Sequence, residues 1–259
     1  MVEKTIQKEM YINDTHIGFY ILAAILGLFV GQFSDWMNKR IPENKKVFST
    51  DIFREYKIQF KPNYILMLIT SGIYGGLVYN LGIQENFIGN LNLIKYALLV
   101  PMILSAFVID YKLKIIPNRL NLAMFEIGMV IVFLYGFSNV AIAIDLLLGM
   151  LVGGGIFLAI TLIGSLIYGK EAMGFGDVKF MAALGLYFGL TNITIISIMS
   201  FLIGSIIGIV LIVGKIKKAN EYIPFGPFIV ISTIICMFIP VELIINILRT
   251  VFTFGMYKG

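Results

Sequence analysis

Two aspartates stand where long apolar runs of this chain meet short polar segments. Asp110 precedes Tyr111-Lys112, and Asp177 follows Gly174-Phe175-Gly176. Hydrolysis of a peptide bond needs one carboxylate to take a proton from water while a second, protonated carboxyl polarises the carbonyl. Two carboxyls that share one proton fill both roles. The pair predicts an acid-base site, although an aspartate that follows glycines at a helix start is, taken alone, more often a cap.

Metal and thiol chemistry find little support in the sequence. Cys236 is the only cysteine and His16 the only histidine. One residue of each kind builds neither a disulfide, nor a cysteine zinc site, nor a histidine triad. We therefore expect a site that uses no metal and no cofactor.

The composition places these aspartates in a membrane protein. Of 259 residues, 59% are hydrophobic and only 14% are charged, and the mean hydropathy is +0.92. Unpaired backbone groups are intolerable in hydrocarbon, so long apolar runs must be helices of about 20 residues each. We predict an all-α polytopic helix bundle. Eight candidate spans lie near residues 18–37, 64–83, 93–109, 119–137, 140–167, 177–190, 192–214 and 225–248.

The basic residues predict the orientation of the spans. The connection 38–62 is rich in lysine and arginine, whereas the next connection, 84–92, has neither. This alternation continues along the chain, and by the positive-inside rule it places both termini on the extracytoplasmic side. Both aspartates then lie at the cytoplasmic face. The net charge of +5 is explained by the basic residues of the cytoplasmic connections, which lie at the lipid surface. We therefore expect no nucleic-acid partner.

Small residues at four-residue spacing predict close helix packing in lipid. The pairs are Gly149/Gly153, Gly185/Gly189 and Gly204/Gly208. Glycine lets two helix backbones approach each other directly.

Three blocks of sequence carry a family resemblance. They are Ile109-Asp110 with Ile116-Pro117-Asn118, the segment from Glu171 to Lys179, and Ile223-Pro224-Phe225-Gly226-Pro227-Phe228. In this order they resemble the type IV prepilin peptidases, a family of membrane aspartic endopeptidases with a Gly-x-Gly-Asp signature. The run from Gly27 to Gly31 is similar to the first span of that family. The resemblance extends over nearly the whole chain, as one membrane-embedded peptidase domain at 1–259.

The resemblance implies an activity and roles for residues. Asp110 and Asp177 would be catalytic, and Gly174, Gly176 and Lys179 would belong to the active-site loop. The substrates would be type IV prepilins or prepilin-like proteins, whose short basic leader is cut off at the cytoplasmic face of the inner cell membrane.

The connection 38–62 departs from the pattern of many bacterial members. Those members carry two Cys-x-x-Cys pairs there and also methylate the new amino terminus of the pilin with S-adenosylmethionine. This connection contains no cysteine. We therefore expect the peptidase without the N-methyltransferase activity.

Three further acids are candidates for substrate binding. Glu126 lies well inside the fourth predicted span, where an acid is costly unless it faces protein or water. Asp35 and Glu171 lie near predicted cytoplasmic boundaries, where they could meet a basic leader. Packing against a polar partner remains an alternative for Glu126, and plain solvation remains one for the other two.

Two other functions remain open from the sequence. A related Gly-x-Gly-Asp protease could cut another substrate, such as a flagellin-like precursor. A membrane transporter would also combine helical spans with interior acids and glycine interruptions, but its expected inverted repeat is not apparent.

Overall fold

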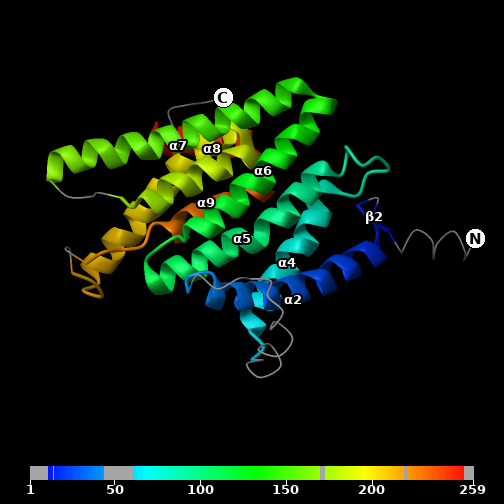
Figure 1. The fold of residues 1–259 in the computed structure, drawn as a ribbon, viewed down its shortest axis with the longest axis horizontal. Coiled ribbons are helices and arrows are strands. Elements are labelled where there is room, and N and C mark those ends of the chain that lie inside the picture. Colours follow the sequence, from blue (N-terminus) through cyan, green and yellow to red (C-terminus); the bar gives the residue numbers. More distant parts are fainter. Residues whose placement is uncertain (1–10, 14, 44–60, 170–172, 219–220, 254–259) are drawn as a thin grey trace, which may run out of the picture. The chain divides into compact units, whose positions relative to one another are not determined.

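The structure is almost entirely helical, as predicted. The computed structural model describes residues 11–13, 15–43, 61–169, 173–218 and 221–253. Its elements are β1 (Tyr11–Ile12), β2 (Thr15–His16), α2 (Ile17–Arg40), α4 (Tyr64–Leu81), α5 (Leu91–Leu113), α6 (Asn118–Ser138), α7 (Val140–Tyr168), α8 (Phe175–Val213), α9 (Gly226–Phe238) and α10 (Val241–Phe252) (Figure 1). The two short strands pair antiparallel, with Tyr11 opposite His16.

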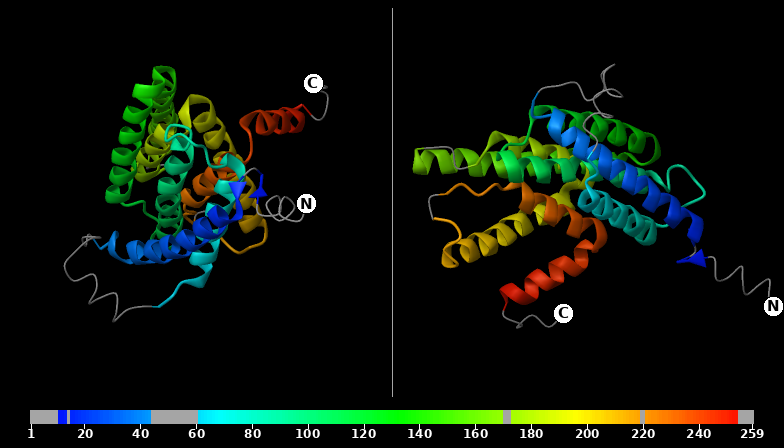
Figure 2. Two further views of the ribbon diagram at one scale, coloured as in Figure 1. Left: turned by 90° about the vertical axis from the view of Figure 1, so that its right-hand side faces the viewer. Right: turned by 90° about the horizontal axis from the view of Figure 1, so that it is seen from below.

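Fewer helices are long enough to cross a membrane than the eight predicted. Among the described residues there are six, namely α2 and α4 to α8. A seventh is obtained if α9 and α10, which are bent by 118° at the break between them, count as one span (Figure 2). The all-α polytopic class is confirmed. One difference in number arises in α8, where two predicted spans form one element, and the other arises at the break between α9 and α10, within the predicted span 225–248.

Helix α8 is broken at Gly189, whose φ of 73° and ψ of −179° are not helical. We call residues 175–188 the first arm and residues 190–213 the second arm. A Cβ atom at Gly153 of α7 would touch both arms, at the carbonyl oxygen of Met181 and at Cγ1 of Ile193. Both arms therefore pack on α7, and the predicted spans 177–190 and 192–214 correspond to them.

The chain forms two compact units, residues 1–105 and 106–259, with the boundary inside α5. In unit 1, α2 packs along α4. A Cβ atom at Gly27 would lie 2.5 Å from the Cα of Ser71, and one at Gly31 would lie 2.6 Å from the Cα of Met67. These two glycines of α2 let the backbones of the two helices meet.

Unit 2 is built around α8, which packs against α6, α7 and α9 (Figure 1). Gly149 and Gly185 lie in direct contact across α7 and the first arm, and Gly153 faces Met181. The predicted packing role of these glycines is confirmed. A Cβ atom at Gly204 would lie 2.9 Å from the ring of Phe228 on α9, whereas one at Gly208 would lie 4.0 Å from Cδ1 of Ile223. The candidate active site lies in this unit.

Candidate active site

Asp110 lies in the last turn of α5, with only 2% of its surface exposed. Its Oδ2 atom accepts a hydrogen bond of 2.8 Å from the backbone N–H of Gly226, the first residue of α9. The N-terminus of a helix stabilises a negative charge. A Cβ atom at Gly226 would lie 2.6 Å from Oδ2, so only glycine leaves room for the carboxylate in this position.

Asp177 lies in the first turn of α8 and is 4% exposed. Its backbone N–H donates to the carbonyl oxygen of Gly174, at 3.0 Å. The side-chain Oδ1 atom is buried and has no hydrogen-bond partner among the described residues. The carboxyl of Asp177 is also within electrostatic range of Asp110. The structure thus brings the two predicted acids, 67 positions apart in the chain, into one buried cluster.

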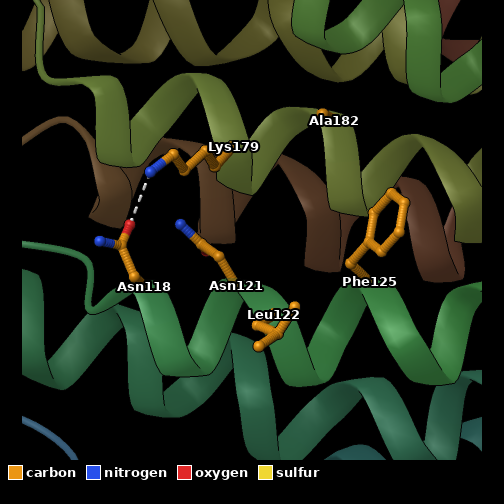
Figure 3. Close-up of a pocket in the computed structure, with 6 residues that line it drawn as sticks. All are labelled: Asn118, Asn121, Leu122, Phe125, Lys179 and Ala182. Carbon is orange, nitrogen blue, oxygen red and sulfur yellow. Dashed lines mark hydrogen bonds between the residues drawn. The ribbon is translucent and has the colours of Figure 1, made fainter.

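The loop that carries Asp177 is held against the start of α6. A Cβ atom at Gly176 would lie 3.2 Å from the carbonyl oxygen of Ile116, so this glycine permits a close approach. The side-chain Nδ2 of Asn121 donates to the carbonyl oxygen of Gly176 at 3.0 Å. Lys179 Nζ donates to Oδ1 of Asn118 at 2.8 Å (Figure 3). These contacts fix the backbone on both sides of Asp177.

The start of α9 is held by an aromatic cluster. The ring of Phe225, which precedes Gly226, lies 4.9 Å from the ring of Phe201 on α8 and 5.9 Å from that of Phe157 on α7, between ring centroids. Phe157 is fully buried. Packing of three segments around Phe225 places the N–H of Gly226 where Asp110 accepts it.

Tyr222 is a third titratable group at this cluster. Burial, and then the negative charges of Asp177 and Asp110, raise the pKa of Tyr222 to about 12. The phenol therefore keeps its proton at neutral pH and remains a hydrogen-bond donor near the two carboxyls. Tyr222 is 47% exposed, in contrast to the two buried aspartates.

The other predicted residues lie apart from this cluster or outside the described part. Asp35 belongs to unit 1, where its two oxygens contact Lys39 Nζ at 2.8 Å and Asn63 Nδ2 at 2.8 Å. Glu126 is exposed on α6. Glu171 and most of the connection 38–62 lie outside the described residues. Substrate contacts of these acids, and a site without a metal, therefore stay predictions.

Two members of the site were not found from the sequence. Asn121 and Tyr222 belong to no chemical pattern, and only their positions in space connect them to Asp177. Gly226 belongs to the third block of the resemblance, so the sequence indicated the residue but not its contact with Asp110. The acceptor of its N–H is 116 positions away and could not be read from spacing.

Fold and site together define a helical membrane protein with a pair of buried carboxylates. The model of the type IV leader peptidase family matches residues 97–213, which include both aspartates. Residues 97–213 are therefore similar to the type IV leader peptidase family, in agreement with the resemblance found in the sequence. No solved structure matches the chain.

Curated relatives agree with this family. The chain is 35% identical over 147 residues to the prepilin leader peptidase/N-methyltransferase of Legionella pneumophila, covering 55% of this chain and 49% of the relative. It is 33% identical over 137 residues to that of Aeromonas hydrophila, covering 52% and 46%. It is 28% identical over 177 residues to that of Stutzerimonas stutzeri, covering 68% and 58%. The chain spans about half the length of the curated relatives that it matches.

Proposed function

We propose that this chain is an aspartic endopeptidase that removes the short basic leader from type IV prepilins or prepilin-like proteins. The observation that carries the proposal is the buried pair Asp110 and Asp177, which lies within the residues matched by the leader peptidase family. Cleavage takes place at the cytoplasmic face of the inner membrane, where the resemblance and the distribution of basic residues put both acids.

The hydrogen bonds suggest a role for each carboxyl. Asp110 accepts the N–H of Gly226 at a helix N-terminus, which favours its ionised form, so it takes the proton from the attacking water. Asp177, whose Oδ1 finds no donor among the described residues and which lies within range of the charge on Asp110, holds the shared proton and gives it to the carbonyl oxygen of the scissile bond. The hydroxide adds to the carbonyl carbon. When the tetrahedral intermediate collapses, the C–N bond breaks, the proton on Asp110 passes to the departing amine, and a hydroxyl of the intermediate returns its proton to Asp177.

The test is incubation of the purified protein with candidate prepilins, followed by measurement of the product masses. The proposal expects a leader peptide and a mature pilin whose masses add up to the precursor plus one water. A flagellin-like precursor serves as the competing substrate in the same assay. If the protein cleaves neither precursor in membranes or detergent, the proposal fails.

We further propose that the mature pilin is released without methylation. The relatives are named as both peptidases and N-methyltransferases, but the connection 38–62 lacks the cysteine pairs of many members. A metal site with four thiolate ligands, which could hold this connection in one conformation, cannot form there. With S-adenosylmethionine in the reaction, the mature amino-terminal peptide is expected at its unmodified mass. A gain of one methyl group that depends on this protein would contradict the prediction and leave the peptidase proposal untouched.

A further inference from the structure

A groove lies between α6 and the first arm of α8, close to the candidate active site. Its volume is about 430 Å³. Figure 3 shows side chains from the two helices facing each other across it. The lining residues are Asn118, Asn121, Leu122 and Phe125 of α6 and Lys179 and Ala182 of α8. All belong to unit 2.

The polar end of the groove is continuous with the loop that carries Asp177. Asn121 lines the groove and also donates to the carbonyl oxygen of Gly176, the residue before Asp177. Lys179, which lies two positions after Asp177, closes the same end through its hydrogen bond to Asn118. A chain bound in the groove would therefore reach the two acids within a few residues.

The other end of the groove is apolar and open. Leu122 is 56% exposed and Phe125 is 39% exposed. Along α6 the lining runs from Asn118 to Phe125, which is about 10 Å at 1.5 Å per residue. This length accommodates about three residues of an extended apolar segment, at about 3.3 Å per residue.

We propose that this groove binds the beginning of the apolar segment of the prepilin, on the carboxyl side of the bond that is cut. The inference rests on the proposed function and assigns a place to one part of its substrate. The positive charge of Lys179 at the polar end disfavours the basic leader in this groove. The leader therefore leaves the site in another direction, and the mature segment lies between α6 and α8.

A peptide suits the groove better than the acyl chain of a lipid. The side-chain Oδ1 of Asn121 is buried and lacks a hydrogen-bond donor among the described residues, and such an orphaned acceptor is costly. Residues at a scissile bond must be extended, because in a helix their backbone groups are already paired. An extended segment offers free N–H donors beside Asn121, whereas an acyl chain offers none.

Photo-crosslinking tests the contact directly. A benzophenone-bearing phenylalanine replaces Leu122 in the Asp177→Asn protein, and the variant is irradiated with prepilin in lipid bilayers. Leu151 on α7, which is 62% exposed, is replaced in the same way as a matched control. We expect position 122 to crosslink to residues just after the cleavage site, and position 151 to remain unlinked to prepilin. Equal crosslinking at both positions, crosslinks from 122 to the leader, or crosslinks only to lipid would overturn the proposal.

Kinetics supply a second, independent measurement. In the otherwise unchanged protein, Leu122→Trp fills the groove and is expected to raise KM for prepilin about tenfold with little change in kcat, because it removes binding rather than chemistry. Leu151→Trp is expected to behave as the unchanged protein. An unaltered KM for Leu122→Trp would reject the groove as the binding site. If the proposed function itself is wrong, the unchanged protein cleaves no prepilin at all. This outcome differs from an unaltered KM for Leu122→Trp, which would reject only the groove.

Discussion

Two aspartates of unit 2 each accept a hydrogen bond from a backbone N–H, but the surroundings of the two side chains differ. Asp145 of α7 accepts the N–H of Leu190 with its Oδ1 at 3.2 Å, and Asp110 of α5 accepts the N–H of Gly226 with its Oδ2 at 2.8 Å. Each contact lies at the start of a helical segment, beside a glycine that has no room for a Cβ atom. Asp145 is exposed, whereas Asp110 is buried within range of Asp177.

The difference between Asp145 and Asp110 distinguishes an aspartate that only caps a helix from one that can take part in catalysis. An aspartate that accepts an N–H at a helix start is fully explained as a cap, and Asp145 needs no further role. Burial of Asp110 beside a second acid is not explained in this way, since two buried carboxyls without a shared proton repel each other. The second carboxyl, and not the cap geometry, therefore marks the candidate active site.

The largest effect is expected from removing either member of the pair. Asp110→Asn and Asp177→Asn should each lower kcat at least about a thousandfold, because one of the two proton-transfer roles is lost. The measurement is the rate of leader release from prepilin. Thermal unfolding in detergent serves as the folding control. Substantial turnover by a folded variant would reject the pair.

The next effect concerns pH. If one proton is shared by the two carboxyls, activity falls at low pH, where both are protonated, and at high pH, where both are ionised. The rate should then change about tenfold per pH unit beyond each limit, and both limits belong to the pair rather than to one residue. Single-turnover rates across the pH range measure this. A flat profile with chemistry rate-limiting would count against a shared proton.

A smaller loss is expected from filling the space beside Asp110. Gly226→Ala puts a Cβ atom 2.6 Å from Oδ2 of Asp110 and pushes the carboxylate away from its donor. A misplacement of about 1 Å at a reacting group costs on the order of a hundredfold in rate. Gly208→Ala is the matched control, since the nearest neighbour of its Cβ atom lies 4.0 Å away. Similar kcat values for both variants would show that the position of Asp110 is unimportant.

The smallest effect on activity is expected from Asp145→Ala. This change removes the acceptor for the N–H of Leu190 and should cost about 1 kcal/mol of stability, the usual loss on removing a cap. The melting temperature in detergent should fall while kcat at a permissive temperature stays close to that of the unchanged protein. A loss of activity as large as that of Asp110→Asn would remove the distinction between the two aspartates.

The sequence predicted the parts of the site that local chemistry determines. The apolar runs predicted the helices, and the residue types near Asp110 and Asp177 predicted the two acids. The geometry at Gly189 could not be predicted in the same way. A break was expected between spans at this point, but the sequence could not predict that a single glycine with positive φ would make it within one helical element.

Contacts between distant segments could not be predicted. The donor of Asp110 is 116 positions away, and Asn121 is 55 positions from the carbonyl group it contacts. Such pairs depend on how α6, α8 and α9 pack, and one sequence contains no periodicity that encodes them. The partners of Asp35 in unit 1, Lys39 and Asn63, illustrate the same limit, because only the nearer one lies at a helical spacing.

The most direct test compares Asp177→Asn with Asp145→Asn on one prepilin, with the product masses as the readout. Both changes replace a carboxylate by an amide of the same shape, and an amide oxygen can still accept the N–H of Leu190. We expect mature pilin and free leader from the Asp145→Asn protein and from the unchanged protein, and intact precursor from a folded Asp177→Asn protein. Mature pilin produced by Asp177→Asn at a comparable rate would show that the two buried carboxyls do not cut the substrate.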